Sequence, residues 1–323
     1  MKKYIVTGVD GQLGSRVAEN MAQQADAQDL LFTCSRMDRV LRPNMERWQN
    51  LGISIIEANY DNELQLLSAF EGGERLWMVS SVLNGPERIK QHKRVLDCAK
   101  RAGIQHITYT SFIGADKENY TQYVLPDHTW TEMYLHQLGV SFNVMRNNLY
   151  LENYFTNSLL MAHLSDYRWC TTAGEGKATF IAKDDSARVG AALLLGKGEV
   201  NQSYDITGVS ISERSICELI SDYSGIPYQY IPMDNEAFYH YLDSLHIPHA
   251  TDGDYSKSPV PWCSNDMVTN ERAISDGLMD VNSNNVELLT GMRPTNPTQL
   301  LPMYKFVWEK QLTNYWVMSS MIH

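Results

Sequence analysis

The sequence lacks the features of a membrane-spanning or disulfide-rich protein. No run of about 18 apolar residues occurs anywhere in its 323 residues, so a membrane-spanning helix is not expected. The five cysteines lie far apart and none forms a C-x-x-C pair, which argues against a zinc site or a disulfide framework. The apolar stretch near the N-terminus is broken at Gly8 and Asp10, too early for a signal peptide. We therefore expect a cytoplasmic protein with no metal site and with buried, reduced cysteines.

Positive charge is also scarce. The chain has 27 lysines and arginines against 38 aspartates and glutamates, a formal net charge of −11. Such a surface repels the phosphates of nucleic acids and anionic membranes, so neither is an expected partner. A composition of 43% hydrophobic and 20% charged residues is that of a folded globular protein rather than a disordered chain.

The first 150 residues alternate between short β-rich runs and helical patterns. Strands are expected at residues 3–7, 30–35, 53–57, 76–80, 104–110 and 140–145. Helices are expected from Gln12, from an N-cap at Asp61, from Pro86 to Gly103, and from Pro126 to Gly139. Strand–helix alternation at this spacing predicts parallel strands joined by right-handed crossovers. The expected fold class is α/β, with a Rossmann-type doubly wound parallel sheet.

The alternation fades after residue 150. A helix at residues 185–195 and a strand at residues 203–207 are expected to return to the sheet. From about residue 211 the chain is rich in aromatic residues and expected loops, with prolines at 227, 232, 248, 259 and 261. We predict a Rossmann domain at residues 1–150, completed by the returning elements near 180–208. Residues 211–323 would form a smaller domain that covers the substrate, since ligands lie beyond the carboxyl ends of such strands.

A glycine-rich turn follows the first predicted strand. Residues 7–14 read TGVDGQLG, with glycines spaced G-x-x-G-x-x-G between a strand and a helix. Glycines permit the tight turn and the close approach of a pyrophosphate, and the start of the helix offers N–H donors to its charge. A tight turn without a ligand is the alternative. The agreement of motif, strand and helix favours a dinucleotide site.

The end of the second strand indicates which dinucleotide binds. NAD sites usually place an acidic residue there to accept the ribose hydroxyls. This chain instead has Arg36, 22 residues after Gly14, and then Arg39. A guanidinium at this place can bind a 2′-phosphate, so NADP(H) is favoured over NAD(H) and residues 1–150 become the NADP-binding domain. A solvated arginine at a strand end is the alternative.

Several longer segments resemble the NmrA-like group of atypical short-chain dehydrogenase/reductases. The resemblance is greatest to its branch of NADPH:quinone reductases and triphenylmethane-dye reductases. It runs nearly end to end and depends on TGVDGQLG at 7–14, YTSFIGAD at 109–116, H-x-x-T-E at 128–132, LHQLGVSFNVMRNNLYLEN at 135–153, FIAKDDSARVGAALLL at 180–195, YDITG at 204–208 and VELLTGMRP at 286–294.

This resemblance implies a set of binding residues. The residues implied to contact the cofactor are Thr7, Gly8, Gly11, Gln12, Leu13, Gly14, Arg36, Ser80, Ser81, Val82, Thr110, Ser111 and Phe112. The residues implied on the substrate side are Phe112, Asn148, Leu149 and Tyr150.

The sequence departs from the wider superfamily in its proton-transfer residues. No lysine has a tyrosine four residues before it, so the usual Tyr-x-x-x-Lys pair is missing. The corresponding helix carries His128 and Glu132, which fall on one helical face at i, i+4. Such a pair either moves protons near neutral pH or forms a structural ion pair. The candidate catalytic residues are His128, Glu132 and Ser111, of which Ser111 is implied to lie near the nicotinamide.

These features favour a reductase of conjugated acceptors. Hydride addition to a quinone or a cationic dye does not need the tyrosine, because the product anion can take a proton from water or a weak acid. The expected function is NADPH-dependent transfer of a hydride to a quinone or a similar aromatic or enone acceptor. The alternative is an NADP(H)-binding redox sensor without turnover. The apolar tail at residues 315–322 is either a subunit contact or a segment packed on its own chain.

Overall fold

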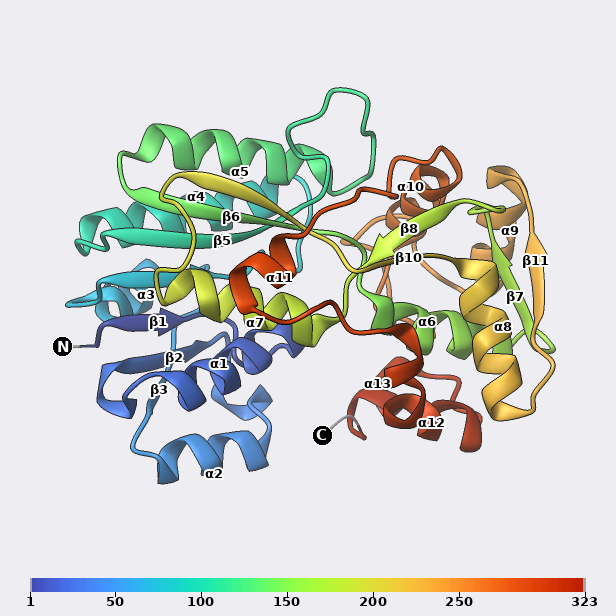
Figure 1. Ribbon diagram of the computed structural model, residues 1–323, viewed down its shortest axis with the longest axis horizontal. Helices are drawn as coiled ribbons and strands as arrows, with labels where there is room; N and C mark the ends of the chain where they lie inside the picture. Colours follow the sequence, from blue (N-terminus) through green and yellow to red (C-terminus); the bar gives the residue numbers. More distant parts are fainter. Residues whose placement is uncertain (1, 322–323) are drawn as a thin grey trace.

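The computed structural model describes residues 2–321 and contains a seven-stranded parallel sheet (Figure 1). The strand order is β3-β2-β1-β4-β5-β6-β9. The strands are β1 (Tyr4–Val6), β2 (Leu30–Cys34), β3 (Ser54–Glu57), β4 (Arg75–Met78), β5 (His106–Phe112), β6 (Ser141–Asn147) and β9 (Gln202–Ile206). All seven predicted strands are confirmed, with ends that differ by no more than two residues. The predicted return of the chain to the sheet is confirmed by parallel pairing of β9 with β6.

Helices cover both faces of this sheet. One face packs against α1 (Gln12–Gln24), α2 (Arg42–Asn50), α7 (Lys183–Leu194) and α11 (Asn285–Thr290). The other packs against α3 (Glu63–Phe70), α4 (Pro86–Arg101) and α5 (Leu125–Leu138). A doubly wound Rossmann sheet is therefore confirmed.

Two predicted helix starts need correction. Asn62, rather than Asp61, caps α3, because its side chain accepts the Gln65 N–H at 3.1 Å. The Asp61 carboxylate instead accepts a bond from Gln91 at 2.7 Å. Helix α7 begins at Lys183, two residues before the predicted start. The predicted first-turn position of Pro86 and the predicted end of α5 near Gly139 are confirmed, and Gly139 adopts the left-handed conformation.

A second lobe lies beyond the carboxyl ends of the strands (Figure 1). It contains α6 (Leu151–His163), β7 (Arg168–Thr171), β8 (Lys177–Phe180), β10 (Val209–Ser212), α8 (Glu213–Ser224), β11 (Gln229–Pro232), α9 (Asn235–Ser244), α10 (Ser264–Ser275), α12 (Leu301–Glu309) and α13 (Tyr315–Ser319). Besides the expected loops, the described part of residues 211–323 contains six α-helices, α8 to α13, which the sequence analysis did not predict. Ile216, Cys217 and Ile220 already form an apolar stripe at helical spacing in α8.

The core of the second lobe draws on two separated parts of the chain. It includes residues of α6, β7 and β8 as well as the later helices. Helix α11, by contrast, returns to the sheet and buries Val286 and Leu289 there. The boundaries at residues 150 and 211 remain predictions. The chain's last helix, α13, packs on its own chain through Met318, which is fully buried; residue 322 of the predicted tail lies outside the described residues.

All five cysteines are free and buried. Within residues 2–321, no helix is long and apolar enough to cross a bilayer.

Two buried carboxyl groups meet in the core of the second lobe. Glu213 and Glu271 are 1% and 8% exposed, and the negative charge of Glu213 adds to the rise in the pKa of Glu271. Trp169 Nε1 donates to Glu213 at 3.1 Å, and Thr171 Oγ1 donates to Glu271 at 2.9 Å. Burial raises the pKa of both groups, that of Glu271 well above 4.5. The pair therefore retains a proton that sits on Glu271.

This retained proton makes stability depend on pH. The folded chain keeps a proton that the unfolded chain releases above pH 4.5, the ordinary glutamate pKa, so stability should fall as the pH rises from there toward the raised pKa. Glu271→Gln needs no proton and should flatten this decline. Thermal unfolding of both proteins from pH 5 to pH 9 measures it, with exposed Glu236→Gln as the control. Parallel pH curves for wild type and Glu271→Gln would contradict the proposal that Glu271 retains its proton.

Candidate functional site

The candidate site begins at the turn between β1 and α1, where backbone atoms pack closely together. Gly8 has a φ of +65°, and a Cβ on it would meet Val79 Cγ1 at 2.5 Å. A Cβ on Gly14 would meet the Gly8 carbonyl oxygen at 2.1 Å. The Gly11 N–H donates to the same oxygen at 2.9 Å. The turn itself therefore requires glycine at positions 8 and 14.

The first turn of α1 leaves N–H groups available to a ligand. The Ser15 N–H bonds to the Gly11 carbonyl at 3.1 Å, so the N–H groups of Gln12, Leu13 and Gly14 have no acceptor within the helix. Gly11 is the N-cap and has no side chain that could satisfy them. Free amides at the positive end of the helix dipole suit an anion such as a pyrophosphate.

Thr7 holds the neighbouring strands together. Its hydroxyl bonds to the Tyr60 hydroxyl at 2.7 Å and accepts the Val79 N–H at 3.1 Å. Tyr60 in turn donates to the Val79 carbonyl at 2.9 Å. Because Thr7 is fully buried, these bonds fix the turn relative to the end of β4.

A guanidinium and two carboxylates lie near the end of β2. Arg36 is exposed, with 56% of its side chain accessible, and pairs with Asp38 through two hydrogen bonds. The Asp10 carboxylate, from the glycine turn, accepts the Ser35 N–H at 3.1 Å and the Ser35 hydroxyl. Arg36 is thus free to turn toward a phosphate by exchanging one surface partner for another. The sequence analysis assigned no role to Asp10, although its place within the glycine motif marked it.

Buried side chains hold the loop after β4 in place. The Ser80 N–H donates to Thr110 Oγ1 at 2.8 Å, and the Ser81 N–H donates to His92 Nε2 at 2.9 Å. The Ser81 hydroxyl bonds to Gln91. Val82, by contrast, is 90% exposed. The loop therefore presents Val82 to solvent from a fixed backbone.

Ser111 and Glu132 belong to a buried charged chain. Ser111 Oγ donates to Glu132 Oε1 at 2.5 Å. Arg146 holds the same carboxylate through Nε at 3.1 Å and Nη2 at 2.6 Å, and it also pairs with Asp116 at 2.7 Å. The predicted i, i+4 ion pair between His128 and Glu132 is not formed, because Arg146, on the adjacent strand β6, takes the carboxylate.

His128 lies in a separate buried network. Its Nδ1 bonds to the Tyr109 hydroxyl at 2.8 Å, and its Nε2 lies 3.3 Å from Arg88 Nη1. Burial, and after it the positive charge of Arg88, lowers the pKa of His128 well below 6.5. The imidazole is therefore neutral near pH 7, which does not suit a shuttle that must gain and lose a proton there. The Phe112 ring stacks on it with centroids 6.2 Å apart.

The implied substrate-side residues differ in how free they are. Phe112 and Tyr150 are half-buried, whereas Asn148 and Leu149 are buried. The Asn148 amide donates to Thr179 Oγ1 and to the Met279 carbonyl, each at 2.9 Å. Asn148 thus ties the sheet to the second lobe, and Phe112 and Tyr150 are the members of this group with accessible surface.

A lysine that the sequence analysis did not select lies beside the glycine turn. Lys183 Nζ donates to Gln12 Oε1 at 2.6 Å and to Asn153 Oδ1 at 3.0 Å. Burial lowers its pKa to about 8. A basic residue in the first turn of a helix opposes the helix dipole, and this was the available signal in the segment FIAKDD.

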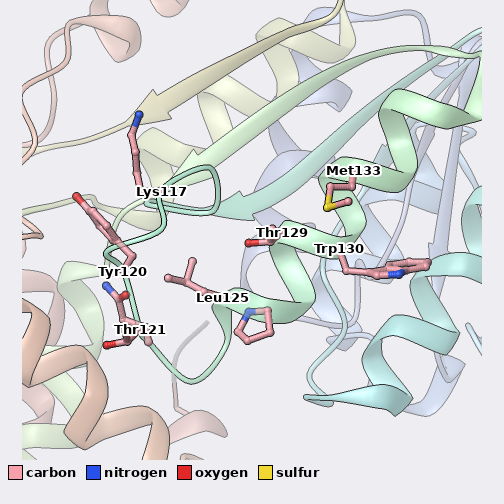
Figure 2. A pocket seen from close by; sticks show the side chains of 9 residues that line it. Lys117, Tyr120, Thr121, Leu125, Thr129, Trp130 and Met133 are labelled. Carbon is pink, nitrogen blue, oxygen red and sulfur yellow. The ribbon is translucent and has the colours of Figure 1, made fainter.

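A hollow of about 570 Å³ lies elsewhere, on the outer side of the start of α5 (Figure 2). Figure 2 shows Lys117, Tyr120 and Thr121 on the loop before this helix, and Thr129, Trp130 and Met133 on the helix. None of the predicted site residues lines it. Among residues 2–321 no cluster of three or more potential metal ligands occurs.

Several known proteins are similar to this chain in sequence and in fold. The sequence pattern of the NmrA-like family matches residues 1–256. Quinone oxidoreductase 2 of Escherichia coli (strain K12) is 31% identical over 208 residues, which are 64% of this chain and 68% of that protein. An NAD(P)H azoreductase of Xenophilus azovorans is 20% identical over 250 residues, 76% of this chain and 82% of that one.

Two solved structures share the fold over nearly the whole chain. The NADPH-dependent quinone oxidoreductase of Escherichia coli complexed with NADPH matches with a TM-score of 0.79 and 24% identity, covering 93% of this chain and 98% of that one. The triphenylmethane reductase of Citrobacter sp. matches with a TM-score of 0.79 and 21% identity, covering 94% and 99%. The match over residues 1–256 confirms the resemblance found in the sequence: this chain belongs to the NmrA-like family.

Proposed function

We propose that this protein is an NADPH-dependent oxidoreductase that transfers a hydride to a quinone or a similar conjugated aromatic or enone acceptor. The observation that carries this proposal is the bare, close-packed turn before α1, with its three free amides. Relatives named as a quinone oxidoreductase and an NAD(P)H azoreductase support the reaction class. Structural neighbours bound to NADPH and to NADP(H) support the cofactor.

The residues of the turn fit a dinucleotide. The N–H groups of Gln12, Leu13 and Gly14 would receive the pyrophosphate, and the missing side chain at Gly14 keeps its backbone closely packed against Gly8. Arg36 would bind the 2′-phosphate after leaving Asp38. Lys183 adds a positive charge beside Gln12. When bound, the cofactor supplies the hydride.

The acceptor would lie against exposed apolar surface beyond strands β4 and β5. Val82, on the loop after β4, is exposed, and Phe112, at the end of β5, is half-buried with its ring stacked on His128. A flat aromatic acceptor suits this arrangement because its binding depends on placement and exclusion of water more than on polar contacts.

The proton that completes the reduction would come from solvent. The Tyr109 hydroxyl is bonded to His128, and burial raises the pKa of Tyr109 far above 10. It is therefore a poor stand-in for the missing tyrosine–lysine pair. A quinone that accepts one hydride becomes a hydroquinone monoanion, and one proton then gives the neutral product. Water is sufficient for this proton since the oxyanion is stabilised by conjugation.

A regulatory protein that binds NADP(H) without turnover is the second candidate. It is favoured by one observation: Ser111, His128 and Glu132 are all buried and held in hydrogen bonds within the fold. Under that alternative these residues are structural. Cofactor binding then alters the surface that the protein presents to a partner, and no substrate is converted.

One assay separates the two candidates. Purified protein is mixed with NADPH and a panel of quinones, triarylmethane dyes and enones, and the absorbance of the reduced nicotinamide is followed. The reductase proposal expects consumption of NADPH with at least one class of acceptor. Tight binding of NADPH without consumption across the panel would instead support the regulatory candidate.

The role of Arg36 can be tested through cofactor preference. Arg36→Ala should weaken the binding of NADPH far more than that of NADH, because only NADPH carries the 2′-phosphate. Titration calorimetry with both cofactors measures this difference. Arg42→Ala removes an exposed arginine of the next helix, 84% accessible, and is the matched control. Equal losses for both cofactors would show that Arg36 does not bind the phosphate.

The turn itself can be tested with Gly14→Ala. The added methyl group forces backbone apart, and overpacking of this kind costs about 1–3 kcal/mol of stability. We expect a lower melting temperature together with a large loss of NADPH affinity. Ser15→Ala introduces the same residue one position later and should change neither strongly. Normal NADPH binding by Gly14→Ala would exclude the turn as the pyrophosphate site.

A further inference from the structure

Gln12 is the first residue of α1, and both polar atoms of its side-chain amide bond to residues of other helices. Its Nε2 donates to the Tyr315 hydroxyl of α13 at 2.7 Å, a contact across 303 residues of sequence. Its Oε1 accepts from Lys183 Nζ of α7 at 2.6 Å. The same lysine donates to Asn153 of α6 at 3.0 Å. Three helices thus meet at the residue that opens the candidate dinucleotide site.

Helix α13 is fixed in place by contacts independent of Gln12. The Tyr315 N–H donates to the Pro259 carbonyl at 2.8 Å. The Asn314 side chain accepts the N–H groups of Trp316 and Val317, which caps the helix. Met318 is fully buried in the core of the second lobe. The tail is therefore packed as part of that lobe, and Tyr315 contacts Gln12 of the Rossmann lobe.

The contact leaves the anion-binding groups available. Tyr315 bonds to the side chain of Gln12, so the Gln12 main-chain N–H stays free. Tyr315 acts as an acceptor in this bond, and no acceptor within residues 2–321 takes its own hydroxyl hydrogen. A hydrogen-bond donor from the second lobe is thus held against the side chain of Gln12, one of the three residues with a free amide. A bound phosphate would add to this arrangement rather than break it.

We propose that helix α13 is part of the dinucleotide site, with Tyr315 as the residue that positions Gln12 and holds the second lobe against the bound cofactor. The proposal rests on the NADP(H) binding proposed above. It requires that the cofactor and α13 stabilise each other, because each holds the first turn of α1 in the same conformation. The cofactor should therefore slow the opening of α13, and loss of the Tyr315 hydroxyl should weaken binding.

The test begins with hydrogen–deuterium exchange of the full chain with and without saturating NADPH. We expect NADPH to slow exchange in residues 315–321 as well as in the first turn of α1. The dissociation constant for NADPH is then compared among wild type, Tyr315→Phe and Tyr223→Phe. Tyr223→Phe removes the hydroxyl of a half-exposed tyrosine on α8 and is the matched control.

Tyr315→Phe removes one neutral hydrogen bond and should weaken NADPH by about two- to twelvefold, with no change in Tyr223→Phe. Unchanged exchange in residues 315–321, together with unchanged affinity of Tyr315→Phe, would overturn the proposal. A variant ending at Leu312 that binds NADPH more tightly than wild type would also overturn it, since α13 would then compete with the cofactor. If the wild-type chain binds neither NADPH nor NADH, the proposed function itself fails, and the first titration shows this directly.

If Tyr315→Phe also destabilises the cofactor-free protein, its affinity alone is not decisive. Exchange in the unaltered chain then decides, because it compares the same molecule with and without NADPH. Slower exchange of α13 on binding supports the coupling, and equal exchange contradicts it.

Discussion

The rest of the structure depends on the contact between the Gly8 carbonyl and the first turn of α1. An ideal Cβ on Gly14 would lie 2.1 Å from the Gly8 carbonyl oxygen, so there is no room for a side chain. Without one, the three free amides at the start of α1 remain accessible. The other features of the site are arranged around that point. Thr7 ties the turn to β4, Asp10 ties it to the end of β2, and Gln12 ties it to the second lobe. A defect in this packing would therefore disturb every neighbouring element together.

Beyond the turn, the polar side chains near the sheet's carboxyl edge serve mainly to hold loops. Neutral His92 accepts the Ser81 N–H, and burial lowers its pKa to about 3. Glu132 is shared by Ser111 and Arg146. The protein thus fixes its backbone here with buried polar contacts and leaves the apolar side chains of Val82 and Phe112 accessible. This division of labour suits a reaction in which placement matters more than acid–base catalysis.

The sheet and its order of elements could be predicted from sequence because short β-rich runs alternate with helical stripes, and strands β1, β2, β4 and β5 are largely buried. The glycine turn could be predicted because its spacing expresses a local packing rule. The partners of His128 and Glu132 could not, since Arg88 and Arg146 approach from other elements. Lys183 and Tyr315 reach Gln12 across 171 and 303 residues, and no local pattern encodes such contacts. The helices after residue 211 were missed because their apolar stripes are short, like that of Ile216 and Ile220, and lie among many prolines and tyrosines.

The most direct test of the account is where NADPH binds. Amide chemical shifts of the assigned protein, followed by NMR during a titration with NADPH, report this residue by residue. The account predicts that the largest changes occur at Gln12, Leu13 and Gly14, with further changes at Arg36 and at Ser80 to Val82. Changes confined to the hollow beside α5, or no changes at saturating NADPH, would contradict it.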